Sequence, residues 1–346
     1  MSRWSYFAKR LILSIPVILF GTSLTFIAIR MGPIDPVAAV YGDSGTAADM
    51  ARMRESLGLN DPLWQQYLEF IWDMFRFDLG QSWVLQPGSR TTDLILSRAP
   101  RTVWMGFWAV LIPLFIGIPL GFYAGLNPNT VGDYTASFGG IVWRAMPNFW
   151  LAVILMIGLS NSESLLFGFD WKGFILHTPQ VIGTNEFQSA WNGLQAGQLE
   201  PIQWAKATKQ ILPASVVLGS ASMGNEMRIG RTAMLETKHS NYVEMAKAKG
   251  VSGRSLVWKH MFRNALIPLV PVITAEANLL LGGSVLIESV LSINGIGLLF
   301  FRALTQADLP VAGALMYVFI LLLVFINIMQ DLLYTIIDPR VGYENE

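Results

Sequence analysis

The sequence predicts an all-α membrane protein with six transmembrane helices and both termini in the cytoplasm. Three observations support this fold class. Apolar and aromatic residues (AVILMFWYC) make up 53% of the 346 residues and charged residues only 14%, whereas an ordinary soluble domain carries about 25% charged residues. Several apolar runs are long enough to cross a bilayer, which takes about 20 residues. Lys and Arg also concentrate in one internal segment, as they do in cytoplasmic loops.

The composition excludes other classes of protein. The 24 Lys and Arg are balanced by 24 Asp and Glu, so the chain lacks the basic surplus that nucleic-acid binding needs. A disordered chain would combine low hydrophobicity with high net charge, and this one has neither. Because there are no cysteines, disulfides, thiolate catalysis and Cys-ligated metals are also excluded.

Six apolar segments are the predicted spans. The first follows Lys9 and Arg10, as in a signal peptide. Its apolar run exceeds the usual length of about 7–15 residues and no small-residue cleavage site follows, so we expect it to be retained. The fourth is the least apolar, being rich in Ala, Ser and Gly, but small residues let helices approach closely in a bundle. The predicted spans are 11–29, 102–126, 136–159, 211–229, 266–287 and 311–336.

The loop charges predict the orientation. Residues 228–264 carry eight Lys and Arg against two acidic residues, whereas 288–310 carries only Arg302 among basic residues. The first of these segments is therefore predicted to be cytoplasmic. The predicted organisation is an N-terminal segment with the first span (1–30), an extracytoplasmic segment with an amphipathic helix (31–101), the second and third spans (102–160), an extracytoplasmic loop (161–210), the fourth span (211–229), a cytoplasmic loop (230–265), and the last two spans with a C-terminal tail (266–346).

The amphipathic helix of the first extracytoplasmic segment follows from its spacing. Asp61 is predicted to be its N-cap and Pro62 its first residue. We expect this helix to lie on the bundle or at the membrane interface. Its apolar residues recur at i, i+4: Leu63, Tyr67, Ile71 and Phe75, with Trp64, Leu68 and Trp72 beside them.

The chain lacks the motifs of an enzyme. It has no G-x-x-x-x-G-K-[ST] for binding ATP and no H-E-x-x-H for zinc. Its three histidines are scattered, and no Ser-His-Asp order is accompanied by a nucleophile elbow. We therefore expect no catalytic residues, no cofactor and no metal site.

The predicted cytoplasmic loop contains a short helix. Residues 242–249 are mostly good helix formers, and Gly250 is a natural C-terminal stop. A helix of about two turns is too short to be stable alone in water, so it needs a partner surface. Its basic surroundings suit phospholipid headgroups or an acidic protein groove, or they reflect only the charge bias of an ordinary cytoplasmic loop.

The same helix carries a resemblance to a known family. Glu244, Ala246 and Gly250 match the E-A-A-x-x-x-G signature of ATP-binding cassette (ABC) importer permeases, with Met245 in place of the first Ala. The wider pattern resembles the dipeptide/oligopeptide/nickel subgroup, and the long first outer segment resembles the first of its two permease subunits. Further matching stretches are 57–62, 78–82, 147–149, 260–268, 288, 295–297, 308–310, 327, 331, 334 and 338–340.

The resemblance implies a fold, partners and a site. It implies the type I ABC importer permease fold in the inner (cell) membrane, among membrane lipids. A second permease subunit, two ABC ATPase subunits and an extracytoplasmic solute-binding protein would be its partners, with a peptide or related small solute as substrate. The helix at 242–249 would be the coupling helix, seated in a groove of an ATPase subunit. The expected ATPase-coupling residues are Tyr242, Glu244, Ala246, Ala248 and Gly250.

Arg144 and Glu276 are charged residues inside predicted spans. A charge in hydrocarbon is costly, so each is expected to face the bundle interior or water. One interpretation is that they line the translocation pathway and meet the termini of a zwitterionic peptide. The other is a structural ion pair, or an Arg144 that extends toward the membrane surface. The family also usually has a small or neutral residue at Arg144 and Pro at Asn294, and its 161–210 loop is usually shorter.

Two other functions remain open. An ion-gradient-driven secondary transporter would need a midplane ion site and usually has inverted repeats and broken helices. A membrane enzyme would need a catalytic set. The substrate itself is not predicted, because the external binding protein usually selects it.

Overall fold

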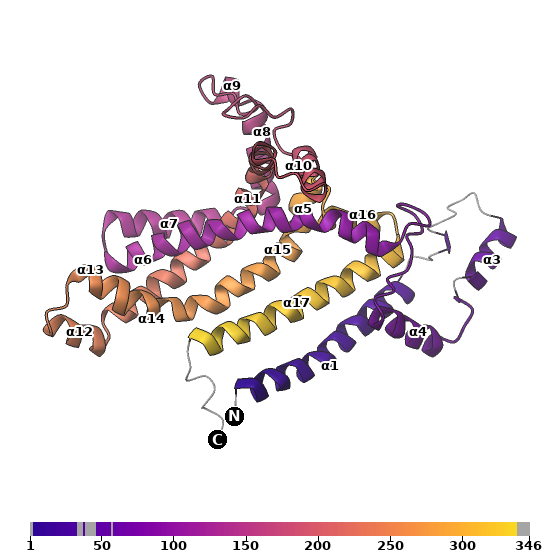
Figure 1. The fold of residues 1–346 in the computed structure, drawn as a ribbon, viewed down its shortest axis with the longest axis horizontal. Coiled ribbons are helices and arrows are strands. Elements are labelled where there is room, and N and C mark those ends of the chain that lie inside the picture. Colours follow the sequence, from indigo (N-terminus) through magenta and orange to yellow (C-terminus); the bar gives the residue numbers. More distant parts are fainter. Residues whose placement is uncertain (1–2, 33–36, 39–45, 57, 338–346) are drawn as a thin grey trace. The chain divides into compact units, whose positions relative to one another are not determined.

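The computed structural model describes residues 3–32, 37–38, 46–56 and 58–337, without the side chains of 3–7, 275–283 and 334–337. Across these residues the regular structure is helical, apart from one antiparallel bridge between Gln81 and Arg90, which confirms the all-α class (Figure 1). The α-helices are α1 (Arg3–Arg30), α3 (Ala47–Ser56), α4 (Leu63–Phe75), α5 (Thr91–Ile112), α6 (Ile118–Leu126), α7 (Val131–Ala145), α8 (Asn148–Ser160), α9 (Ser162–Leu165), α10 (Asn185–Gln195), α11 (Pro201–Lys238), α12 (Asn241–Ala248), α13 (Gly253–Ser255), α14 (Phe262–Leu266), α15 (Val270–Val290), α16 (Ile296–Thr305) and α17 (Leu309–Ile337).

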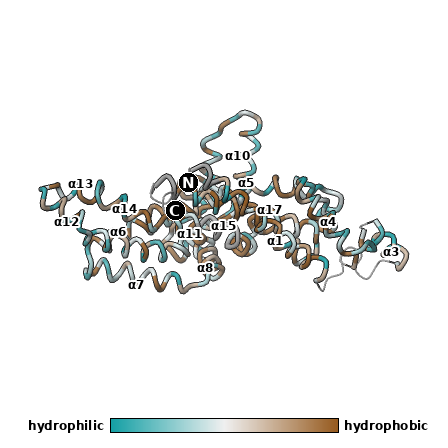
Figure 2. Tube along the Cα trace, turned by 90° about the horizontal axis from the view of Figure 1, so that it is seen from below, coloured by the Kyte–Doolittle hydropathy of each residue, from teal (hydrophilic) through white to brown (hydrophobic). Residues whose placement is uncertain are grey.

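The chain divides into two compact units. One comprises Met1–Pro100 with Asn294–Ile328, and the other comprises Arg101–Ile293 with Met329–Glu346. Hydrophobic residues recur along α15 and α17 in Figure 2, whereas hydrophilic residues mark α3 and α12. Each unit is described by itself below.

Three helical stretches are long and apolar enough to cross a membrane within the described part of the chain. They are Ala8–Arg30, Thr91–Leu126 and Leu309–Leu333. The predicted first, second and sixth spans fall largely within these stretches. By length and composition, these three spans agree with the sequence prediction, while the full number of six remains a prediction.

The predicted third span is not one straight helix. The α7 and α8 helices meet at a bend of 98°. Only together are they long and apolar enough to cross a membrane. The junction residue Met146 is extended, with φ −83° and ψ 127°, and Pro147 follows it. Because a proline disfavours helical geometry at the residue before it, the helix breaks here. The prediction of a continuous span over 136–159 was wrong on this point.

The predicted fourth span lies inside a much longer helix. Helix α11 has 38 residues, which makes it about 57 Å long. It therefore exceeds the hydrocarbon core of about 30 Å, so it would continue beyond the membrane at one or both ends.

Helices α6 and α11 pack backbone against backbone. A Cβ on Gly125 would lie 2.6 Å from the carbonyl oxygen of Arg231, and a Cβ on Gly121 would overlap the carbonyl oxygen of Met227. Such close approach is what small residues permit in membrane bundles, and Gly224 in the fourth predicted span is similarly close, since a Cβ there would lie 2.6 Å from the carbonyl oxygen of Gly140. The facing sets repeat every four residues: Gly117, Gly121 and Gly125 against Met223, Met227 and Arg231.

We expect Gly121→Ala to destabilise the protein by about 1–3 kcal/mol, because the new methyl group must push two helices apart. Gly139→Ala is the matched control, since a Cβ at Gly139 has nothing within 4 Å. The control should be neutral or slightly stabilising, because Ala favours a helix over Gly. Thermal unfolding of the detergent-purified protein measures both variants, and equal midpoints would contradict the close packing.

In the other unit, α4 is amphipathic as predicted, but the predicted N-cap was wrong. Pro62 rather than Asp61 is its N-cap, because the Pro62 carbonyl accepts the first i+4 hydrogen bond of the helix, from Gln66 N at 3.2 Å. The packing face of α4 includes Gln66 and Met74, which are buried. Tyr67 contacts Phe26 of α1 edge to face, with ring centroids 5.4 Å apart, and Phe70 contacts it at a tilt, at 5.6 Å. The face left exposed carries Leu63, Trp64, Leu68, Trp72 and Phe75.

A buried carboxylate ties the segment after α4 to the start of α17. Asp308 has no exposed surface and accepts hydrogen bonds from Ser82 Oγ at 2.5 Å and from Leu85 N at 2.9 Å. The backbone N–H groups of Trp83 and Val84 donate to it at 3.1 Å. A carboxylate that receives this many donors is firmly held, so the segment is fixed in place.

Candidate functional site

The short helix predicted at 242–249 is present as α12, and its end has a defined geometry. Gly250 has φ +76°, a left-handed conformation that suits glycine. Its N–H donates to Lys247 O at 2.9 Å, and Val251 N–H donates to Ala246 O at 3.2 Å. This pair of bonds is a Schellman motif. The predicted glycine stop is confirmed.

Helix α12 has one buried face and one exposed face. Val243 is fully buried and Ala246 is 8% exposed, one turn apart. By contrast, Met245 is 57% exposed and Tyr242 41%. Ala246 therefore packs within its own chain rather than being available to a partner. The exposed residues of α12 and its C-terminal turn are Asn241, Tyr242, Glu244, Met245, Lys247, Ala248, Lys249 and Gly250.

The buried face of α12 packs on the helical segment Leu256–Met261 and joins a hydrophobic cluster near the ends of α6 and α11. Val243 and Ala246 belong to one hydrophobic cluster with residues of α6 and α11, including Phe122 and Met234. The Tyr242 hydroxyl accepts a hydrogen bond from Asn264 Nδ2 at 2.9 Å. These contacts provide the partner surface that an eight-residue helix needs.

An ion pair fixes the first turn of α7 to α11 near this cluster. Arg231 donates from Nε and Nη2 to the two oxygens of Asp133, at 2.6 and 2.7 Å. The Asp133 side chain is 2% exposed and that of Arg231 is 31% exposed. Nearby, Lys238 Nζ donates to the Leu126 carbonyl at 2.8 Å. The geometry is bidentate, which adds directional rigidity.

The charge state of this pair follows from its contacts. Asp133 precedes the predicted third span, which begins at residue 136. Hydrogen bonding from Arg231 lowers the pKa of Asp133 to about 2, against the opposing effect of burial. The backbone N–H of Asn129 also donates to it, at 2.9 Å. The carboxylate is therefore ionised throughout the physiological pH range.

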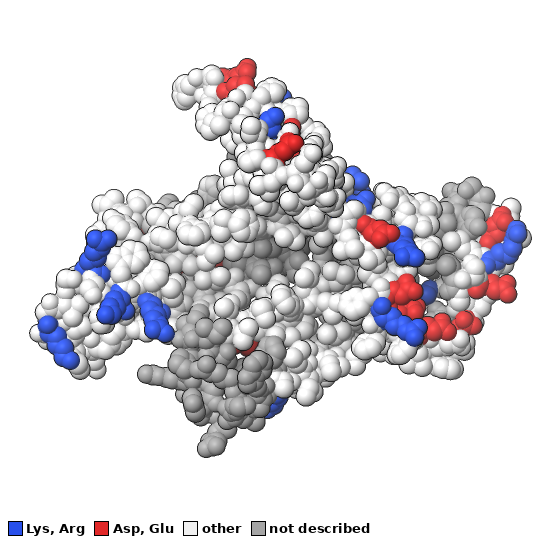
Figure 3. All heavy atoms as spheres, viewed as in Figure 1, with Lys and Arg blue, Asp and Glu red and all other residues white. Residues whose placement is uncertain are grey.

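Basic side chains surround the exposed face of α12. On the face of the molecule drawn in Figure 3, the region of α12 to α14 shows Lys and Arg without neighbouring Asp or Glu. The basic residues of this stretch are Lys247, Lys249, Arg254, Lys259 and Arg263. This charge distribution suits an acidic surface.

Of the two predicted pathway charges, Arg144 and Glu276, the structure describes the side chain of Arg144 alone. Arg144 is exposed near the end of α7, and its Nη1 lies 3.5 Å from Asn225 Oδ1 of α11. Glu276 lies outside the residues whose side chains are described. Two other carboxyl groups, Glu226 and Glu288, are fully buried, and Glu288 accepts a hydrogen bond from Thr102 Oγ1 at 2.7 Å.

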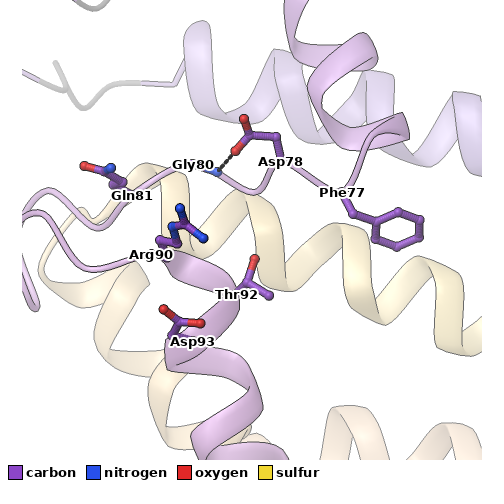
Figure 4. Close-up of a pocket in the computed structure, with 7 residues that line it drawn as sticks. All are labelled: Phe77, Asp78, Gly80, Gln81, Arg90, Thr92 and Asp93. Atoms are coloured by element: carbon purple, nitrogen blue, oxygen red, sulfur yellow. Dashed lines mark hydrogen bonds between the residues drawn. The ribbon is translucent and has the colours of Figure 1, made fainter.

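A polar recess of about 670 Å³ opens beside the segment after α4. Figure 4 shows Asp78, Gly80 and Gln81 on that segment, and Arg90 and Asp93 at the start of α5. Gly80 N–H donates to Asp78 Oδ1 at 3.3 Å. The recess presents charged groups of both signs to solvent, so it could accept a polar or charged side chain of a partner.

Sequence reasoning missed three features of the site. Val243 anchors α12 and Met245 projects from it, although the i, i+3 spacing of Val243 and Ala246 was a usable signal for the buried face. The third is the Asp133–Arg231 pair, whose partners are 98 residues apart. The sequence alone contains no signal that joins them.

Comparison with known proteins places the chain in a family. A family model described as "Binding-protein-dependent transport system inner membrane component" matches residues 117–343, and the model of the corresponding N-terminal region matches residues 3–105. Together these models cover nearly the whole chain. They confirm the resemblance that the motifs indicated.

Individual relatives match over almost their full length. The chain is 30% identical to the oligopeptide transport system permease protein AppB of Bacillus subtilis, over 98% of this chain and 99% of the relative. It is 32% identical to the dipeptide transport system permease protein DppB of Alkalihalophilus pseudofirmus and 29% identical to DppB of Escherichia coli, again over 98% of this chain and 99% of each relative. With two family models and full-length relatives in agreement, the chain belongs to the family of binding-protein-dependent transport system inner membrane components.

Proposed function

We propose that the chain is a transmembrane permease subunit of an ABC importer for di- or oligopeptides or related small solutes. It forms half of the translocation pathway and couples to separate ATPase subunits. The names of its full-length relatives support peptides as the substrate class. The family to which it belongs supports a transport role rather than an enzymatic one.

One structural observation supports the coupling role most directly. Helix α12 combines a buried face that fixes it to α6 and α11 with an exposed face that has an apolar stripe. Tyr242, Met245 and Ala248 form that stripe, at three-residue spacing. In a loop that we place in the cytoplasm, no lipid would cover these side chains. A groove of an ATPase subunit is the surface that fits them.

The same contacts suggest how motion is transmitted. ATP-driven closure of the ATPase subunits would move α12, and its buried face would pass the displacement to α6 and α11. The glycine contacts and the Asp133–Arg231 pair hold these elements together, so they would move as one body. The bundle would then shift between inward-open and outward-open states, driven by their different affinities for the nucleotide-bound ATPase.

Each predicted site residue keeps a distinct role in this proposal. Tyr242, Glu244 and Ala248 are exposed and would contact the ATPase subunit. Ala246 would seat the helix, and Gly250 would end it. Arg144 and Glu276 would line the pathway and meet the charged termini of a peptide.

The remaining partners and the orientation follow from the same proposal. A second permease subunit would complete the pathway, and an extracytoplasmic solute-binding protein would deliver the solute, with the polar recess near Arg90 as one of its contacts. Contacts within each unit are consistent with both termini in the cytoplasm. Asp133 and Arg231 join two predicted cytoplasmic segments, and Ser82 and Asp308 join two predicted outer ones.

Co-purification tests the proposal. The tagged chain, co-expressed with the permease, ATPase and solute-binding proteins encoded near it, should retain the ATPase subunits through size exclusion. Proteoliposomes of that complex should take up labelled dipeptide only with ATP and the binding protein. The alternative is a secondary transporter, and uptake by this chain alone under an ion gradient would establish it instead.

We expect Met245→Glu to weaken assembly with the ATPase subunits by about tenfold, because it places a charge in a predicted apolar contact. Met245→Leu is the matched control, since it keeps the size and apolar character of the side chain. The yield of co-purified ATPase at fixed detergent and salt measures both variants. If Met245→Glu assembled normally, Met245 would not be part of the interface with the ATPase subunit.

A further inference from the structure

A second recess, of about 190 Å³, lies in the unit that contains α1, α4 and α17. It extends from the last residue of α1 to the first residues of α17, and its lining is mixed in character. Phe26, Phe70 and Leu309 contribute apolar surface, and Arg30, Asp73 and Asp78 contribute charge. A pocket with charges of both signs above apolar surface suits a zwitterionic ligand with a hydrocarbon part.

Arg30 supplies a half-buried positive group to the recess. Its Nη1 is buried and has no hydrogen-bond partner among the described residues. Arg30 also forms no ion pair within the described part of the chain, although two carboxylates line the same recess. A buried N–H without an acceptor is unfavourable, so an anionic group placed against Nη1 would stabilise it.

Asp73 and Asp78 supply the negative charges of the recess. Burial, together with repulsion from Asp78 and Glu69, raises the pKa of Asp73. These effects outweigh the opposing attraction of Arg76. A cation placed beside Asp73 and Asp78 would relieve their repulsion. Among the described residues, Arg30 thus has no ion-pair partner, and the attraction of Arg76 offsets only part of the cost of ionising Asp73.

The position of the recess in the fold indicates its depth in the membrane. The apolar stretches Ala8–Arg30 and Leu309–Leu333 both end at it. The ends of spanning helices lie at the level of the lipid headgroups. Neighbouring α4 exposes Trp64 and Trp72, and tryptophan is enriched at that level.

We propose that this recess binds the headgroup of phosphatidylethanolamine, with the phosphate on Arg30 and the ammonium beside Asp73 and Asp78. An ammonium donates hydrogen bonds to carboxylates, which the trimethylammonium of phosphatidylcholine cannot do. Phosphatidylglycerol has the phosphate without the cation. The acyl chains would continue along the apolar surface of Phe26 and Phe70. A peptide is also zwitterionic, but the ends of two spans favour a lipid.

Native mass spectrometry of the co-expressed complex tests the proposal. The complex is incubated with equal amounts of palmitoyl-oleoyl phosphatidylethanolamine, phosphatidylcholine and phosphatidylglycerol. We expect phosphatidylethanolamine to be retained preferentially. Arg30→Gln should weaken this retention about tenfold, since charge-assisted hydrogen bonds are lost. Asp73→Asn should reduce the preference over phosphatidylglycerol specifically, which a folding defect would not do.

Arg302→Gln is the matched control, because it removes the same charge from an exposed position that does not line the recess. It should leave the preference unchanged. Equal retention of the three lipids, or an equal loss in Arg302→Gln, would overturn the proposal. Displacement of the lipid by millimolar dialanine would overturn it in favour of a peptide site.

Discussion

Replacing Gly250 with Val should leave the ATPase active while solute uptake falls about tenfold. Gly250 has φ +76°, where a β-branched residue is strained by about 1–3 kcal/mol. The strain is relieved if the last turn of α12 unwinds, which would break the two bonds of the Schellman motif. A frayed helix would absorb the motion of the ATPase instead of transmitting it. A difference of about 1.4 kcal/mol corresponds to a tenfold effect.

The Gly250→Asn variant distinguishes backbone strain at residue 250 from the effect of adding a side chain there. Asn adopts the left-handed conformation more readily than other non-glycine residues, and a Cβ at Gly250 has nothing within 4 Å. The Asn variant should therefore transport nearly normally. The measurement is the ratio of ATP hydrolysed to dipeptide imported in proteoliposomes, with the amount of membrane-inserted protein held equal. Normal uptake by the Val variant would show that the stop is not needed for coupling.

The features that could be predicted from the sequence are local ones. The α12 helix and its glycine stop depend on residues within ten positions, and helix propensity with one glycine suffices to find them. The spans within Ala8–Arg30 and Leu309–Leu333 follow from hydropathy alone. The family follows from short motifs in their order along the chain.

The errors arose where tertiary contacts or backbone sterics decide the outcome. The bend at Met146 comes from Pro147, a local signal that hydropathy averaging ignores. On α4, apolar residues cover most of the helix, so the pattern could not identify the face that packs on Phe26. In the sequence, Arg30 only follows the first predicted span, because the lack of a described hydrogen-bond partner for its Nη1 is visible only in three dimensions.

Replacing Asp133 with Asn should lower the stability of the folded protein by about 3 kcal/mol. Breaking a buried ion pair costs about 3–5 kcal/mol, and the lower end applies because Arg231 keeps 31% of its side chain exposed. Asn has nearly the same shape and keeps one oxygen as acceptor, so the loss reports mainly the charge. The midpoint of thermal unfolding in detergent should fall by about 5 °C. Arg228→Met, an exposed change on the same helix, is the control and should have little effect.

The pH dependence distinguishes this ion pair from a packing effect. Because the pKa of Asp133 is lowered to about 2 in the folded protein, its stabilisation is present above the unfolded value of about 3.9 and is lost as the pH falls toward 2. The difference in unfolding midpoint between the native protein and Asp133→Asn should thus be constant from pH 5 to pH 8 and shrink below about pH 4. A packing defect would give a difference that persists in acid. Since the pair fixes the first turn of α7 to α11, the variant should also import less solute per ATP than Arg228→Met, even at temperatures where both remain folded.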